Sequence, residues 1–311
     1  MSALSINKLM RYVLKVLSYP DVDIKKTYKI ERSVSNIRAD KLMNPIHKKW
    51  DKTVFRGDKE INVRVYTPKK EYRKTVLLFF HGGGWVIGNI DSYSNVCAHM
   101  ASMTGCVVVS VDYRLAPEHP FPCGLEDCYA VAREIFLDLT LFGVDKEDIV
   151  LIGDSAGGNL AAAVSLKARD RGEFKVTKQI LIYPSTHNDH SDETGFPSIR
   201  EYGTDYLLTS KRIRDYMDLY RSSDEDLFNP YLAPLIADDL SDQPRTLIIT
   251  AQYDPLRDEG EAYGKKLREH GNTVFIHRMK DSLHGFISLP KHFVHVKRSY
   301  QLINEFLNDT L

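Results

Sequence analysis

Short apolar runs alternate with helical patterns along most of this chain. The runs are rich in Val, Ile and Leu, which is typical of strands buried on both faces. They lie at 75–80, 107–111, 149–152, 180–183, 246–250 and 274–277, and Ile61, Val63 and Val65 alternate as a half-exposed strand. Helical patterns lie near 92–103, 124–137, 156–169, 258–270 and 292–308. This alternation predicts an α/β fold, in which helices cover both faces of a mostly parallel central sheet.

Two segments interrupt the alternation. Residues 1–45 contain a helical pattern but no buried strand, and residues 186–225 are polar and aromatic with no strand of their own. A long insertion in such a sheet is usually functional, and ligands bind at the carboxyl edge of the strands. The sequence therefore predicts a helical cap, made of 1–45 and 186–225, over a catalytic core made of 46–185 and 226–311.

Composition and charge exclude several classes of partner. The 42 Lys and Arg balance 42 Asp and Glu without a block of like charge, which removes the usual electrostatic basis for binding nucleic acid. No apolar run is long enough to span a bilayer. Four cysteines without metal-site spacing predict free thiols in a reducing compartment, so we expect a cytoplasmic protein.

The N-terminal apolar residues follow a helical spacing that Lys and Arg interrupt. This pattern is not typical of a secretory signal, and an amphipathic helix of this kind is expected to pack on the protein itself. We therefore expect no stable membrane association. The residues concerned are Leu4, Leu9, Val13, Leu14 and Leu17.

One serine stands among small residues directly after the apolar run 149–152. The stretch "GDSAG", residues 153–157, fits the G-x-S-x-G pattern of a nucleophile elbow. Such a sharp turn from strand to helix brings backbones close together, so it needs small neighbours. The helix that follows favours developing negative charge at its N-terminus. On this pattern alone, a helix N-cap or a plain tight turn would also explain Ser155.

A run of glycines, "HGGGW" at 81–85, follows the predicted strand 75–80. A phosphate-binding G-x-G-x-x-G beginning at Gly82 would need a glycine where Ile87 stands, and no G-K-[ST] is present. Glycines after an early strand suit an oxyanion hole, because their amides can approach a substrate oxygen without a Cβ in the way. The candidate donors are the amides of Gly83, Gly84 and Ala156.

A serine nucleophile needs a base, and a histidine base needs an acid that orients it. His284 lies in a loop after the strand 274–277, and Asp254 follows the strand that ends in "RTLIITAQY". Both fall at the same sheet edge as Ser155. Asp258 competes for the role of acid, but its position predicts that it lies inside the next helix. Three independent placements agree, and we predict a Ser155, Asp254, His284 triad.

Five motifs, "HGGGW", "DYRLAPEHPFP", "GDSAGG", "DPLRDEG" and "HGF", follow one another between residues 75 and 286. In this order they resemble the hormone-sensitive lipase-like esterases, a branch of the α/β-hydrolases. The resemblance implies the α/β-hydrolase fold, carboxylesterase activity, no cofactor, and a cap built from the N-terminal segment and an insertion. It gives the same catalytic and oxyanion roles to the residues named above. Arg114 and Glu118 of the second motif resemble a loop scaffold without a catalytic role.

The leading hypothesis is a serine carboxylesterase that hydrolyses short-chain acyl esters through an acyl-enzyme, with a small-molecule ester as its partner. An amidase or deacetylase with the same triad and a non-catalytic ligand-binding protein on this fold are the alternatives. The natural ester, the acyl-length limit and the oligomeric state, a homodimer included, stay open.

Two further groups of residues in the insertion allow more than one interpretation. His187, His190 and Asp192 could be imagined as metal ligands, but a polar loop of this kind is expected to be solvated surface, and we predict no metal site. Three tyrosines could line a substrate pocket or merely pack the cap. They are Tyr202, Tyr206 and Tyr216.

Overall fold

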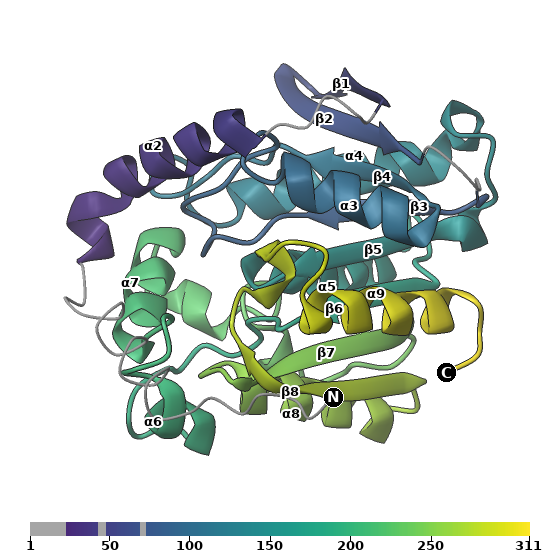
Figure 1. Cartoon of the computed structure of the whole chain (residues 1–311). Coiled ribbons are helices and arrows are strands. Elements are labelled where there is room, and N and C mark those ends of the chain that lie inside the picture. Colours follow the sequence, from purple (N-terminus) through teal and green to yellow (C-terminus); the bar gives the residue numbers. More distant parts are fainter. Residues whose placement is uncertain (1–22, 43–47, 69–72) are drawn as a thin grey trace.

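The computed structural model describes residues 23–42, 48–68 and 73–311, and its centre is one twisted sheet (Figure 1). Eight strands form this sheet in the order β1-β2-β4-β3-β5-β6-β7-β8. β1 (Lys48–Arg56) and β2 (Lys59–Thr67) form an antiparallel hairpin, and β2 also pairs antiparallel with β4. The other neighbouring strands are parallel, which confirms the predicted α/β fold.

The six parallel strands coincide with the six apolar runs predicted from the sequence. β3 is Val76–Phe80, β4 is Val107–Val111, β5 is Ile149–Asp154, β6 is Lys178–Ile182, β7 is Arg245–Tyr253 and β8 is Val274–Leu283. β1 was not predicted, because its sequence, KKWDKTVFR, is mostly charged and carries no continuous apolar face.

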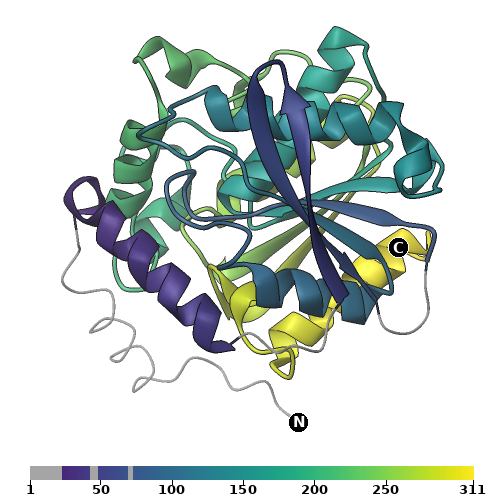
Figure 2. The ribbon, with the colours of Figure 1, turned by 90° about the horizontal axis from the view of Figure 1, so that it is seen from above.

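Helices cover both faces of the sheet (Figure 2). On one face lie α3 (Ser94–Thr104) and α9 (Val294–Leu307). On the other lie α4 (Cys123–Leu137), α5 (Ala156–Arg171) and α8 (Arg257–Glu269). Short 3₁₀ turns occur at Leu139–Leu141, Lys146–Asp148, Glu225–Phe228, Pro234–Ile236 and Phe286–Ser288.

Strand β3 shows how the pleat builds a core on each side of the sheet. Leu77 and Phe79 pack with α3 and α9, whereas Leu78 and Phe80 pack with the opposite cluster, and all are fully buried. Successive side chains of a strand point to opposite faces, so a strand covered on both faces must be apolar at every position. This is why the predicted runs are continuous rather than alternating.

The expectation that β2 is half-exposed is wrong for its second half. Arg64 and Tyr66, which occupy the predicted solvent side, are both buried. The guanidinium of Arg64 donates to Asp51 at 2.7 Å and is paired with Asp91, and the hydroxyl of Tyr66 bonds with Ser94 at 2.9 Å. The reason is tertiary, because α3 and the loop before it cover this face of β2.

Three helices gather at one end of the sheet (Figure 1). They are α2 (Ile24–Leu42), α6 (Pro197–Tyr202) and α7 (Ser210–Tyr220). Ion pairs join α2 to α7, with Lys25 Nζ 2.6 Å from the carboxylate of Asp218 and Arg212 2.9 Å from that of Glu31. The amphipathic pattern of Leu4 to Leu17 lies outside the described residues. In the part of the chain that is described, no helix has the length and apolarity needed to cross a membrane.

Candidate active site

Ser155 lies at the sharp turn between β5 and α5, in the strained conformation that a nucleophile elbow requires. Its φ of 54° and ψ of −119° are rare for a residue with a side chain. A Cβ at Gly153 would lie 2.2 Å from the carbonyl oxygen of Gly157, and one at Gly157 would lie 1.9 Å from that of Phe80. Steric contact with neighbouring backbone therefore explains both glycines of the motif.

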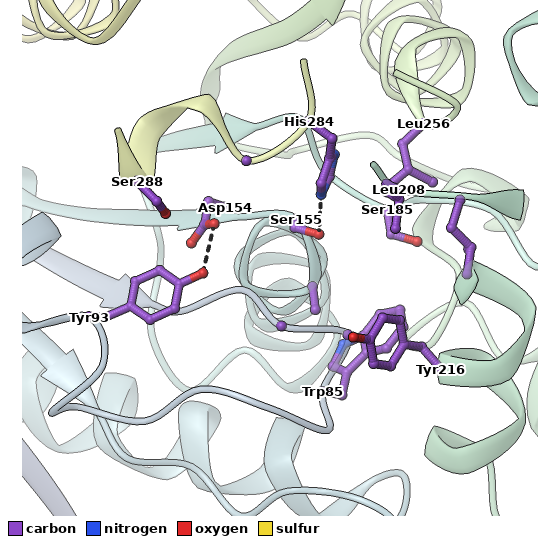
Figure 3. A pocket seen from close by; sticks show the side chains of 15 residues that line it. Trp85, Tyr93, Asp154, Ser155, Ser185, Leu208, Tyr216, Leu256, His284 and Ser288 are labelled. Atoms are coloured by element: carbon purple, nitrogen blue, oxygen red, sulfur yellow. Dashed lines mark hydrogen bonds between the residues drawn. The ribbon is translucent and has the colours of Figure 1, made fainter. Parts of the chain in front are cut away.

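His284 connects Ser155 with Asp254, and Figure 3 shows its contact with the serine. The ring Nε2 lies 2.9 Å from Ser155 Oγ, and Nδ1 lies 2.8 Å from Asp254 Oδ2. Asp254 is fully buried, and its other oxygen accepts the amide of Leu256 at 2.9 Å. A proton on Nδ1 that is donated to this carboxylate leaves the Nε2 lone pair facing the serine hydroxyl. The structure thus brings together the three residues predicted to form a triad.

Asp258 is held elsewhere. It lies in the first turn of α8, as predicted, where its carboxylate accepts the Ser198 amide at 2.8 Å and pairs with Arg257 at 2.7 Å. The expectation that a loop separates the last strand from His284 is wrong. β8 continues through Leu283, so that His284 directly follows the strand.

The glycine loop after β3 lies beside Ser155. Gly83 and Gly84 line the same cavity as Ser155 and Ala156, with φ values of 117° and 60° that favour glycine. Neither glycine amide donates to another group in the described part of the chain. Ala156 is the first residue of α5, where helix amides have no partner within the helix. All three predicted oxyanion donors therefore adjoin the serine, and their catalytic role stays a prediction.

The cavity over Ser155 has a volume of about 170 Å³ and a different chemistry on each side (Figure 3). Polar groups lie on one side of the serine, and a mostly apolar wall lies on the other. The polar side consists of Tyr93, Asp154 and Ser288, and the apolar wall of Trp85, Leu208, Tyr216 and Leu256. Ile213 also lines the cavity and packs in one apolar cluster with Leu256. None of these residues was predicted from the sequence to belong to the site, apart from Tyr216, for which pocket lining and cap packing were both open.

The three tyrosines of the insertion have different positions. Tyr216, on α7, contacts the cavity, and its ring stands where a Cβ on Gly84 would lie 2.4 Å away. Tyr202 and Tyr206 pack against each other at 5.3 Å, and both rings contact Tyr253 of β7. Helix α7 thus brings a residue of the insertion 186–225 to the site, whereas α6 is joined to β7 by aromatic packing.

Burial shifts the pKa of two groups, one next to the serine in sequence and one next to the glycine loop. Asp154, the residue before Ser155, has its pKa raised to about 6 by burial, although hydrogen bonds from Tyr93 and Gly82 oppose the shift. His81 has its pKa lowered to about 4 by burial, so the ring is neutral near pH 7. Asp154 belongs to the GDSAGG motif, but nothing in the sequence around it predicts which groups it hydrogen-bonds.

The expectation that the loop with His187 and His190 is solvated surface is wrong for His190. His190 is buried, with Nε2 2.8 Å from the carboxylate of Glu259 on α8. The amides of Thr186 and His187 donate to the other oxygen of Glu259. Among residues 23–42, 48–68 and 73–311, no group of three or more His, Cys, Asp or Glu is placed to hold a metal ion.

The DYRLAPEHPFP segment forms a scaffold. Arg114 pairs with the buried Asp127 of α4 through both carboxylate oxygens, at 2.7 Å each. Glu118 pairs with Arg32 of α2 at 2.9 Å. Arg32 also donates to the carbonyls of Val86 and Ala116, each at 2.6 Å. One side chain of α2 thus ties the loop after Gly83 and Gly84 to the segment 113–122.

Comparison with known proteins places this geometry in a family. The family described as alpha/beta hydrolase fold matches residues 77–288. An arylesterase of Saccharolobus solfataricus is 37% identical over 252 residues, 80% of each chain. An ethyl acetate hydrolase of Pseudomonas putida is 31% identical over 231 residues, 73% of this chain and 71% of that protein.

A solved structure extends the similarity to nearly the whole chain. The hyperthermophilic esterase from the archaeon Pyrobaculum calidifontis superimposes with a TM-score of 0.87 at 36% identity, over 98% of this chain and 99% of that one. The parallel sheet, the serine elbow and these relatives agree with the resemblance found in the motifs. The chain belongs to the α/β-hydrolase family, in its hormone-sensitive lipase-like branch of carboxylic ester hydrolases.

Proposed function

We propose that the chain hydrolyses short-chain acyl esters with Ser155 as nucleophile, His284 as general base and Asp254 as the acid that orients the histidine. Ser155 Oγ attacks the ester carbonyl while His284 Nε2 takes the hydroxyl proton. The tetrahedral oxyanion binds the amides of Gly83, Gly84 and Ala156. His284 then gives its proton to the leaving alcohol, and the acyl-enzyme remains.

Water completes the cycle by the same steps. His284 takes a proton from water, whose oxygen attacks the acyl-enzyme carbonyl. The second oxyanion collapses, the proton returns to Ser155 Oγ, and the carboxylic acid leaves. The observation that carries this proposal is the continuous contact from Ser155 through His284 to Asp254, at 2.9 and 2.8 Å. These groups need no metal ion, so we expect EDTA dialysis to leave the rate unchanged.

The size of the cavity supports a preference for short acyl groups. Its volume is about 170 Å³, and an apolar cavity of about 150 Å³ accommodates a molecule the size of benzene. We expect acetyl to hexanoyl chains to fit such a space and a palmitoyl chain to exceed it. The similarity to a protein named ethyl acetate hydrolase is consistent with this preference.

The experiment is a panel of nitrophenyl esters from acetyl to palmitoyl, assayed with wild type and with Ser155→Ala as a blank. We expect turnover to peak between acetyl and hexanoyl and to vanish in the variant. A maximum at palmitoyl would contradict the acyl-length proposal. Nitroacetanilide in the same assay tests the amidase or deacetylase alternative, and a wild type without turnover on any substrate would favour the non-catalytic binding protein.

The domain division and the partners belong to this proposal as well. We propose that 1–45 and 186–225 form a cap over a catalytic core of 46–185 and 226–311, supported by the contacts of α2 with α7 and by Tyr216 in the cavity. We propose a cytoplasmic enzyme whose partner is a small-molecule ester, without nucleic acid or stable membrane association. Size-exclusion chromatography with light scattering would test for a homodimer.

A further inference from the structure

The carboxylate of Asp154 joins the two loops that meet at the serine. Its Oδ1 accepts the backbone amide of Gly82 at 2.9 Å. Its Oδ2 accepts the hydroxyl of Tyr93 at 3.1 Å, as Figure 3 shows, and lies 3.5 Å from the hydroxyl of Tyr183. The residue is 2% exposed. The end of β5, the end of β3 and the loop before α3 thus converge on one buried carboxylate.

Gly82 directly precedes the predicted oxyanion donors Gly83 and Gly84. A run of glycines has no side chains that could fix its backbone by packing, so hydrogen bonds to its amides determine where the following N–H groups point. The fit is close, because a Cβ on Gly82 would lie 2.7 Å from Asp154 Oδ2 and 2.9 Å from the Tyr93 hydroxyl. Asp154 is therefore placed to fix this loop relative to the adjoining Ser155.

The same carboxylate reaches the base through Tyr183. The ring of Tyr183 packs against the imidazole of His284, with 4.6 Å between ring centroids. Its backbone has a positive φ of 37°, and its amide donates to the carbonyl of Ile249 at 2.6 Å. Contacts of Asp154 thus extend to the loop with the oxyanion donors on one side and to the ring of the base on the other.

Burying a carboxylate in this position costs free energy of folding. Burial disfavours its charged form, as its raised pKa of about 6 records. An apolar side chain would avoid that cost but could not accept the Gly82 amide. An asparagine could accept this amide through its carbonyl and donate its NH₂ to the Tyr93 oxygen, so the hydrogen bond and the charge can be separated by substitution.

We propose that Asp154 is a positioning residue, whose hydrogen bond to the Gly82 amide fixes the direction of the Gly83 and Gly84 N–H groups toward the oxyanion. The proposal rests on the proposed esterase function. Asp154 does not touch the substrate in this role, and Tyr93 holds its second oxygen. The role requires an acceptor at this position rather than a negative charge.

The experiment compares Asp154→Ala with Asp154→Asn. We expect Asp154→Ala to lower kcat on nitrophenyl acetate by ~10²-fold, the effect of a misplacement of about 1 Å at a reacting centre, with a small change in KM. Asp154→Asn should retain most of kcat because it keeps the acceptor. Glu126→Ala, which removes a partly buried carboxylate that pairs with Lys167 and Arg56 away from the serine, is the control and should leave kcat unchanged. Thermal unfolding of each variant shows whether it is folded.

A second readout isolates the oxyanion. A trifluoromethyl ketone forms a charged tetrahedral adduct with the serine, whereas the matching methyl ketone reports mainly ground-state binding. We expect Asp154→Ala to weaken the fluorinated inhibitor by the same factor as kcat/KM and to leave the methyl ketone nearly unaffected. Equal losses for both ketones would overturn the proposal, because they would indicate a general structural defect.

Two other outcomes would overturn it as well. One is an Asp154→Ala variant as active as wild type, and the other is an Asp154→Asn variant as impaired as Asp154→Ala, which would assign the effect to charge. Failure of the proposed function is a different result, namely wild-type turnover no higher than that of Ser155→Ala.

Discussion

Replacing Gly83 by alanine tests the proposed oxyanion hole at its most constrained position. An added Cβ would lie 2.1 Å from the carbonyl oxygen of Ile87, and the φ of +117° is one that alanine rarely adopts. Non-bonded carbon and oxygen rarely approach closer than about 3 Å, so the loop must move by about 1 Å. The tight turn in which Val86 and Ile87 both donate to the Gly83 carbonyl, at 3.1 and 2.9 Å, would be displaced with it.

Displacement of this loop would change the direction of the Gly83 N–H, which we propose to donate to the oxyanion. A misplacement of about 1 Å costs ~10²-fold in rate, and loss of a whole oxyanion donor costs ~10²–10³-fold. We therefore expect Gly83→Ala to lower kcat by ~10²–10³-fold with a smaller change in KM, because the bound ester carries no oxyanion and the charge develops only as the serine attacks. Stopped-flow and steady-state rates on nitrophenyl acetate measure this, with Ser155→Ala as the blank.

Gly172→Ala is the matched control. Gly172 ends α5 with a φ of +63°, and a Cβ there would meet nothing within 4 Å. Like Gly83→Ala, this variant places an alanine at a positive φ, but it does so without a steric clash and far from the serine. We therefore expect a lower free energy of unfolding and an unchanged kcat. A Gly83→Ala variant that is folded and as active as wild type would refute the assignment of Gly83 to the oxyanion hole.

Three further predictions follow from contacts around the site. Asp254→Asn should lower kcat by ~10⁴-fold, as loss of a triad aspartate does elsewhere, whereas Asp258→Asn should not; steady-state kinetics showing the reverse would move the acid to Asp258. Arg32→Met keeps the side-chain stem but removes the four hydrogen bonds that Arg32 donates to Val86, Ala116 and Glu118, so KM should rise more than kcat falls, and an unchanged KM would contradict the role of α2. Burial raises the pKa of Asp154 from an ordinary 3.8 to about 6, so the folded protein holds this proton more tightly than the unfolded chain. Wild type should therefore lose stability relative to Asp154→Asn as pH rises from about 4 to 7, by about 3 kcal/mol in urea unfolding, and a constant difference would argue against a charged Asp154.

Local physical constraints made the serine elbow and the parallel strands predictable from the sequence. Gly153 is required by a backbone contact with Gly157 inside the elbow, and Gly157 by a contact with Phe80 of the neighbouring strand β3, so the G-x-S-x-G pattern reflects the steric needs of the turn. Continuous apolar runs arise because both faces of each parallel strand are covered. The carboxyl ends of parallel strands lie at one edge, which is why Ser155, Asp254 and His284 could be grouped before any distance was known.

The tertiary structure decided what depends on neighbours far away in the chain. The charged strand β1 joins the sheet through its antiparallel pairing with β2. Arg64 is buried because α3 and the loop before it cover its side of β2. Tyr216 reaches the cavity while Tyr202 packs against Tyr253, although both belong to the same polar insertion. The periodicity of apolar residues indicates which face of a helix or strand is buried. It does not indicate which other segment buries that face, because this depends on the packing of the whole chain. The bond of Asp154 to Gly82, across 72 positions of sequence, is of this second kind.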